Sequence, residues 1–553
     1  MNLPNPALVT QRGARPLPRL ALLLLCAAYV LPGLVGRDPW RNADLVAFAQ
    51  MLGIAQGRIS WLQPSLGQVP LDDAGWLSHG LGALFIHATS PWVDAALAAR
   101  LPFAMMLAFT LSLTWYAAFH LARTERAQPL ALAFGGEAEP VDYARAIADG
   151  AVLALVATLG LLQLGHETTP ELVQLCAASV FLYGLAAGPF RRWQAPLSVM
   201  LSLPALAASG APAIAVALGG VGTVVCIRSA FTGARQLSIW VAIATLAAAA
   251  LATLAGAWQW RVLPPSVDDL PGLLRQWAWF LWPTWPLVLW TLWRWRGRWQ
   301  HRHLSVPMTL LAIGMAASVA MDGQDRALML AVPGAAVLAA FALPTFKRST
   351  TAAIDWFSMF FFSLSAIAIW VIYLAMHTGM PAKPAANVAK LAPGFVADFS
   401  PLSLAVAAAG TLAWLWLLRW RTGRHREALW KSLVLPAGGV ALSWLLLMTL
   451  WLPLLDYARS MRPWIERVAP HLEQAGCVWA PGAARVTVAA LDISRRARVD
   501  ARASDDGSCT LMLRVVRAGP VPDPGAPWVL VAEVRRPTDR DEITALYRRQ
   551  APP

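Results

Sequence analysis

Residues 432–453 read SLVLPAGGVALSWLLLMTLWLP and contain no charged side chain. A helix needs about 20 mostly apolar residues to cross a bilayer, so this run is long enough to span one. Similar runs recur along the chain and predict an all-α polytopic membrane protein with about thirteen transmembrane helices. They lie near residues 20–35, 95–120, 146–165, 170–189, 195–209, 211–227, 237–257, 273–293, 305–321, 327–344, 354–376, 402–420 and 432–453.

The composition agrees with this interpretation and excludes an ordinary soluble protein. Of the 553 residues, 57% are hydrophobic and 14% are charged, and the formal net charge is +14. Most basic residues lie in short clusters between apolar runs, where they orient the spans rather than bind a polyanion. No groove-binding helix or aromatic-basic platform accompanies them, so nucleic acid is not an expected partner.

The basic clusters also predict the topology. They fall on alternate connections, at 123–126, 191–192, 228–235, 294–302, 347–348 and 419–431. Since cytoplasmic connections carry the excess of lysine and arginine, the N-terminus is expected inside. An odd number of spans then places the C-terminus outside. The run at 20–35 has no small-residue cleavage site after it and is expected to be a retained anchor.

Two polar regions remain on the outer face. The loop 37–92 belongs to a predicted transmembrane domain of residues 1–453, and residues 454–553 are predicted to form a small C-terminal α/β domain. That domain has a helical stretch, Ser460–Gln474, and two strand-like runs, Cys509–Val516 and Trp528–Val534. Cys477 and Cys509 lie in the same domain, where an oxidising compartment favours a disulfide over two free thiols.

The distribution of polar residues points to chemistry at the outer surface. Ionisable residues are scarce in the middles of the spans, which argues against an ion-coupled transporter. Carboxylates recur in the outer loop, at Asp38, Asp44, Asp72 and Asp73. Glycosyl transfer needs a carboxylate that accepts the proton of the acceptor. The alternative is structural: Asp38 caps a helix, and Asp72 and Asp73 form a turn.

The order of motifs along the chain carries a family resemblance. The motifs are Trp40, Asp44, Met51, Gly57–Pro64, Asp72–His79, Ala99–Pro102 and Asp325–Pro333. This order resembles the GT-C superfamily of polyprenyl-phosphate-sugar-dependent glycosyltransferases, specifically glycosyltransferase family 39 and its ArnT-like members. The resemblance implies transfer of a sugar from an undecaprenyl-phosphate carrier to a lipid A-like lipid or another envelope acceptor. It also implies a bacterial inner-membrane protein with a cytoplasmic N-terminus and a periplasmic C-terminal domain.

Some motifs depart from the family pattern. Ala43 stands where the family has the first residue of an acidic pair, so Asp44 is the first candidate for the catalytic base and Asp38 the second. Asp72 and Asp73 are candidates for holding the acceptor or the sugar. The departures leave an alternative open, in which the chain is a catalytically degenerate homologue that acts as a membrane scaffold or lipid-binding protein.

Arginines are the expected partners of the lipid phosphate, because charge builds on its oxygens as the sugar bond breaks. Arg326 coincides with the position of a family arginine, and Arg58 and Arg261 are further candidates. The alternative for Arg326 is a helix-end arginine that snorkels to the interface. Glu167, in a turn rich in titratable groups, is a candidate for the acceptor site, with a helix cap as the alternative. No metal or cofactor is expected.

Overall fold

The computed structural model describes residues 5–71, 75–131, 135–258, 266–321, 324–423, 428–505 and 507–550. Contacts within the chain divide it into two compact units. Unit 1 comprises Met1–Pro32, Phe103–Ile367 and Ala405–Leu447; unit 2 comprises Gly33–Pro102, Ala368–Leu404 and Met448–Pro553. Most of the outer loop at 37–92 and the C-terminal region therefore belong to the same unit.

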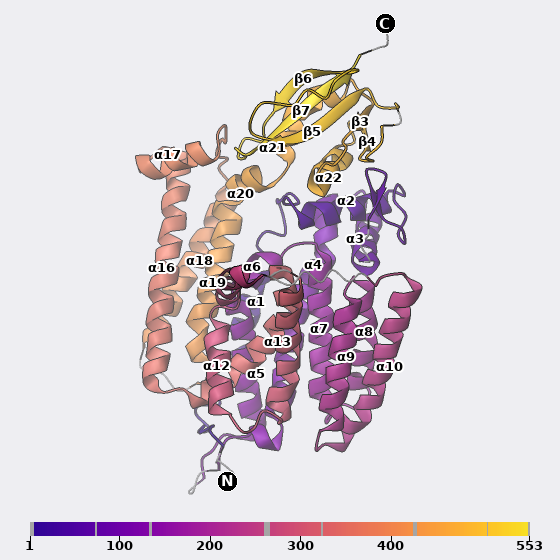
Figure 1. Cartoon of the computed structure of the whole chain (residues 1–553). Helices are drawn as coiled ribbons and strands as arrows, with labels where there is room; N and C mark the ends of the chain where they lie inside the picture. The colour runs from indigo at the N-terminus through magenta and orange to yellow at the C-terminus, as the bar shows by residue number, and fades with distance from the viewer. Residues whose placement is uncertain are drawn as a thin grey trace. The chain divides into compact units, whose positions relative to one another are not determined.

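Membrane helices make up most of unit 1, where they run side by side (Figure 1). Within the described ranges, eight helical segments are long and apolar enough to cross a membrane. They are α4 (Ala95–Ala122), α7 (Pro170–Ala187), α10 (Thr232–Leu254), α13 (Arg302–Ala320), Asp325–Thr345, α16 (Arg348–Thr378), α18 (Pro401–Thr422) and α19 (Lys431–Leu450). The segment Asp325–Thr345 contains α14 (Asp325–Leu328), α15 (Val332–Ala340) and two short 3₁₀ turns. The fold is thus the polytopic helical membrane fold that the sequence predicts.

The other five predicted spans are shorter or interrupted helices. They correspond to α1 (Arg19–Val30), α5 (Pro140–Ala157) with α6 (Leu161–Leu164), α8 (Gln194–Ala208), α9 (Pro212–Ile227), and α11 (Leu270–Phe280) with α12 (Thr284–Arg294). The run at 273–293 breaks because Pro283 has no N–H to continue the helical hydrogen bonds. The runs at 195–209 and 211–227 are two helices, separated where Gly210 adopts a φ of 91°.

Small residues allow the helices of unit 1 to pack closely. A Cβ added to Gly184 of α7 would lie 2.9 Å from the Val199 side chain of α8, and one added to Gly314 of α13 would lie 2.7 Å from the backbone nitrogen of Ala331. Glycine at these positions lets the backbones approach, as is typical of helices packed in a membrane. The segment Asp325–Thr345 is the most enclosed of the eight, with its apolar window entirely buried.

One buried carboxylate organises the start of unit 1. Asp149 of α5 accepts hydrogen bonds from the Leu17 backbone N–H and the Trp115 indole N–H, both at 2.8 Å. Asp149 also lies 3.7 Å from Nη1 of Arg19, the first residue of α1. Asp149 thus attaches the segment at the start of α1 to α4 and α5, which gives this charged residue a structural role.

Unit 2 contains a five-stranded mixed sheet in the order β4-β3-β5-β7-β6. The β3 strand pairs in parallel with β4 and β5, whereas β7 pairs antiparallel with β5 and β6. The strands are β3 (Cys477–Trp479), β4 (Arg498–Asp500), β5 (Leu511–Arg517), β6 (Trp528–Val534) and β7 (Glu542–Arg549), and the two helices of the domain are α21 (Arg462–Leu472) and α22 (Arg485–Ser494).

Alternate residues of the strands enter two different apolar clusters. Leu511 and Leu513 pack with Trp464 of α21 and with α22, whereas Met512 packs with Tyr547 in a smaller cluster. This alternation follows from the two-residue period of a strand. The domain is therefore α/β, as the sequence predicts.

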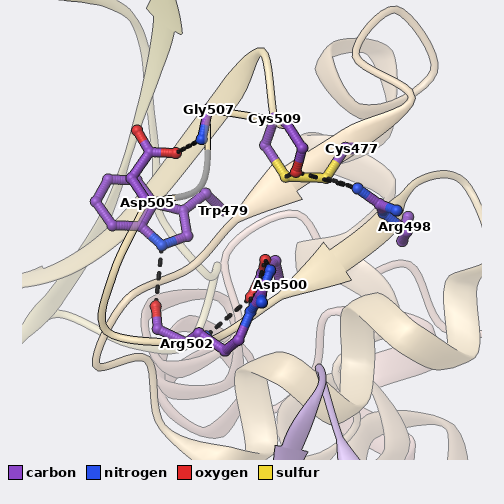
Figure 2. Close-up of polar contacts among 9 residues, drawn as sticks. Cys477, Trp479, Arg498, Asp500, Arg502, Asp505, Gly507 and Cys509 are labelled. Atoms are coloured by element: carbon purple, nitrogen blue, oxygen red, sulfur yellow. Dashed lines mark hydrogen bonds and ion pairs between the residues drawn. A yellow bond between two sulfur atoms is a disulfide. The ribbon is translucent and has the colours of Figure 1, made fainter.

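The strands β5 and β6 match the two predicted runs, Cys509–Val516 and Trp528–Val534, whereas β3, β4, β7 and α22 were not anticipated. Cys477 and Cys509 form a disulfide (Figure 2). Beside it, Trp479 donates its indole N–H to the Arg502 carbonyl oxygen at 3.0 Å, and Arg502 pairs with Asp500.

The remaining elements of unit 2 are short. They are α2 (Ala43–Ala55), α3 (Trp76–Thr89), α17 (Ala382–Leu391), α20 (Leu452–Arg459) and the hairpin of β1 (Ser65–Leu66) with β2 (Val69–Pro70). Leu45 and Ala49 of α2 pack into the same apolar cluster as α21 and α22. The residues just before α2 are therefore held against the C-terminal domain.

Candidate functional site

Asp44, in the first turn of α2, is a buried carboxylate. Its Oδ2 accepts the backbone N–H of Trp40 at 3.0 Å and lies 3.7 Å from Nη2 of Arg37. The side chains of Arg37 and Asp44 are 0% and 1% exposed. A buried ion pair of this kind fixes the residues that precede α2, since removal of either charge would weaken the compensation of the other.

Arginines surround Trp40. The guanidinium of Arg37 lies 4.8 Å from the ring centroid and that of Arg459 lies 5.0 Å from it. Such cation–π contacts orient an aromatic ring as well as stabilise it. A third arginine, Arg100 of α4, is buried and donates to the Leu34 carbonyl oxygen at 3.4 Å.

Asp456 of α20 joins this group from the far end of the sequence. It accepts the indole N–H of Trp40 at 2.7 Å, and its other oxygen accepts the backbone N–H of Asp38 at 3.1 Å. Burial raises the pKa of Asp456 to about 6, and the charge of Asp38 adds to the rise, while the two N–H donors and Arg37 oppose it. A carboxylate with this pKa changes charge close to neutral pH.

Asp38 is more accessible than Asp44. Its side chain is 20% exposed and pairs with Arg462, which is itself 67% exposed. An incoming group could replace so exposed a partner at little energetic cost. We refer to Arg37, Asp38, Trp40, Asp44, Arg100, Asp456, Arg459 and Arg462 as the Asp456 cluster; all of them belong to unit 2.

Next to this cluster, Arg41 anchors the same loop to the sheet. Its guanidinium contacts Asp539 at 3.0 Å and Glu542 at 3.1 Å. A small cavity lies there, and its polar walls include Arg41, Arg536, Asp539 and Glu542. The loop before α2 is thus held by ion pairs to β7 and its preceding turn as well as by Asp456.

Arg58 is also engaged with the C-terminal domain. Its Nη1 contacts both carboxylate oxygens of Asp492 in α22, at 2.8 and 2.9 Å, and its Nε contacts Gln56 at 3.0 Å. The two charged side chains are 34% and 21% exposed. Arg58 therefore attaches the end of α2 to α22 in this structure.

A second group of predicted residues meets in unit 1. Arg326 contacts Glu167 at 2.5 Å, Thr169 at 3.2 Å and Glu171 at 3.6 Å, and these four residues are here called the Arg326 cluster. Glu167 is 5% exposed. The structure therefore brings together Arg326 and Glu167, although they lie 159 residues apart.

Three predicted residues, Asp72, Asp73 and Arg261, lie outside the described residues. Among the residues that are described, no set of three or more histidine, cysteine, aspartate or glutamate side chains is placed to hold a metal ion.

Comparison with solved structures identifies the fold, whereas no family model and no curated protein sequence matches the chain. ArnT from Cupriavidus metallidurans bound to undecaprenyl phosphate is similar, with a TM-score of 0.57 and 13% identity over 95% of this chain and 96% of that chain. The apo state of the same protein gives a TM-score of 0.54 and 14% identity over the same shares. At such identity the likeness concerns the fold alone, and the chain has an ArnT-like fold. The eight apolar helical segments of the described residues identify it as a multi-pass membrane protein.

Proposed function

We propose that this protein is a membrane glycosyltransferase that moves a sugar from a polyprenyl-phosphate carrier to a lipid acceptor. The observation that carries the proposal is the Asp456 cluster, which combines partly exposed and buried carboxylates with arginines in the segments that flank the spans. The similarity to an ArnT structure bound to undecaprenyl phosphate supports the choice of donor. A lipid A-like acceptor and a bacterial inner-membrane location, with the C-terminal domain in the periplasm, are parts of the same proposal.

Asp38 is the proposed proton acceptor. In the transfer, the acceptor oxygen forms a bond with the anomeric carbon while the bond from that carbon to the phosphate oxygen breaks. The acceptor proton passes to the carboxylate, and the phosphate leaves with the bonding electron pair. Asp44 shares the acidic loop, but its burial and its contact with Arg37 suit it to holding that loop in place.

The arginines of the cluster would stabilise the leaving phosphate. Arg459 and Arg462 are exposed and lie beside Trp40 and Asp38, respectively. Guanidinium groups bind phosphate oxygens through two parallel N–H bonds and so provide charge stabilisation without a metal. Arg326 is a further candidate, but Glu167 and Glu171 already neutralise it, so a phosphate there would have to displace one of them.

The proposal can be tested with the full-length protein in proteoliposomes. The assay supplies undecaprenyl-phosphate-linked aminoarabinose and purified lipid A, and mass spectrometry follows the product. Asp38→Asn should lower the rate roughly 100-fold or more, because general-base catalysis contributes on that order. Asp492→Asn is a matched control, since it removes one carboxylate from another contact between the outer loop region and the C-terminal domain.

A scaffold or lipid-binding function is the second candidate, and the burial of Asp44 favours it. With Ala43 beside it and Arg37 as its partner, Asp44 has no exposed surface for chemistry. In that case the wild-type protein would bind undecaprenyl phosphate in the same proteoliposomes without forming product. Product formation that survives Asp38→Asn would instead retain the transferase and remove Asp38 as its base.

A further inference from the structure

The contact between Asp38 and Asp456 is not explained by packing alone. The two residues lie 418 positions apart in the sequence, and the backbone N–H of Asp38 donates a hydrogen bond to Oδ2 of Asp456 at 3.1 Å. An ionised acceptor makes stronger hydrogen bonds than a neutral one, so the charge of Asp456 strengthens its hold on the loop. The neighbouring charge of Asp38 opposes this ionised form.

Both oxygens of Asp456 are used to hold the loop. One accepts from the indole of Trp40 and the other from the backbone of Asp38 itself. The hydrogen bond from the Asp38 backbone fixes the position of the Asp38 main chain. The hydrogen bond from the indole orients the Trp40 ring, which is in contact with both Arg37 and Arg459. A change of position at residue 456 would therefore move both Asp38 and the neighbouring arginines.

We propose that Asp456 is a positioning residue for Asp38, which it holds in place through hydrogen bonds from the Asp38 backbone and the Trp40 indole. This inference rests on the proposed function, which assigns the acceptor's proton to Asp38. In this pair Asp456 holds the loop through two hydrogen bonds, whereas Asp38 meets the substrate.

Charges of both signs act on the ionisation of Asp456. Arg37 favours the ionised form and Asp38 disfavours it. Arg100 of α4 interacts electrostatically with Asp456, Asp38 and Asp44. Arg459 and Arg462 are the remaining cations of the cluster. Burial dominates and raises the pKa of Asp456 to about 6, so the group loses its charge as the pH falls through that value.

The first test is the pH profile of sugar transfer in the proteoliposome assay. The wild-type rate should fall as the pH drops through about 6. Asp456→Asn removes the charge, so it should lower the plateau rate about tenfold to 100-fold, as expected for a misplaced reacting group. It should also abolish the fall near pH 6. Asp456→Glu, which keeps the charge, should restore part of the rate and the fall in rate near pH 6.

The second test does not need activity. The peptide that covers residues 37–44 should be less protected from hydrogen exchange in Asp456→Asn than in the wild type at pH 7.5. The protection of the wild type at pH 5, corrected for the slower intrinsic exchange at that pH, should approach that of the variant. Trp40→Phe, which deletes only the indole donor, should show a smaller increase. Asp492→Asn should exchange this peptide as the wild type does. Size-exclusion profiles identify any variant that fails to fold.

The two tests separate the inference from the proposed function. If the wild type forms no product but exchange responds to Asp456→Asn, the transferase proposal fails while the fastening of the loop stands. If the wild type is active and Asp456→Asn keeps both the wild-type plateau rate and the fall in rate near pH 6, the positioning role is wrong. Unchanged exchange in a folded Asp456→Asn variant would also overturn it.

Discussion

The two charged clusters of this protein differ in the balance of their charges. The Arg326 cluster sets one arginine against two glutamates, all within hydrogen-bond or ion-pair distance. The Asp456 cluster places carboxylates among four arginines, two of which are exposed. A leaving phosphate is drawn to an excess of cations, so the comparison favours the Asp456 cluster as the site of the chemistry. The Arg326 cluster resembles a closed structural network.

The largest effect on stability should come from the buried pair in the Asp456 cluster. Asp44→Asn leaves the fully buried Arg37 without its carboxylate partner. Removing one member of a buried ion pair typically costs about 3–5 kcal/mol. We expect a clearly lower thermal unfolding midpoint of the detergent-solubilised protein. A midpoint within error of the wild type would show that Arg37 does not depend on Asp44.

An intermediate effect is expected at the Arg326 cluster. Glu167→Gln removes one of the two negative charges that neutralise Arg326. If phosphate can bind there, the variant should lower the apparent KM for the polyprenyl-phosphate donor a few-fold, since Arg326 becomes more available. If the cluster is purely structural, the variant should lower the thermal midpoint and leave the donor KM unchanged. Titration of the donor at fixed acceptor separates the two results.

The smallest effect is expected where the loop region meets α22. Asp492→Asn breaks an ion pair whose side chains are 34% and 21% exposed. Pairs of this exposure contribute under about 1 kcal/mol, because water screens them. Thermal unfolding should shift slightly and sugar transfer should stay near the wild-type rate. A large loss of transfer would mean that Arg58 takes a direct part in the site.

The sequence predicts the elements of this protein better than their contacts. A long apolar run is explained by a membrane-spanning helix, so most of the spans are found where they are expected. The predicted helix at Ser460–Gln474 is also found, as α21. The runs at 146–165 and 273–293 are exceptions, since each is divided between two helices and hydropathy alone does not register a break such as the one at Pro283. Of the sheet, β6 has a clear strand pattern, whereas residues 543–547 of β7 are all buried and show no alternation.

The sequence also indicates where acidic residues gather but not which of them act together. Asp38 and Asp44 stand out in the outer loop, and Asp44 gives no sign of its burial. Asp456 is missed because its partner Trp40 lies 416 residues away, and such contacts depend on the tertiary fold. One signal was available: Asp456 is an acidic residue directly after a long apolar run, where burial and an altered pKa are common.

The most direct measurement is the rate of sugar transfer by purified Asp38→Asn in proteoliposomes, compared with the wild type and with Asp492→Asn. We expect product from the wild type and the Asp492 variant at similar rates, and a rate at least about 100-fold lower from Asp38→Asn. Equal rates from all three proteins would contradict the assignment of the chemistry to the Asp456 cluster. No product from the wild type would contradict the proposed activity itself.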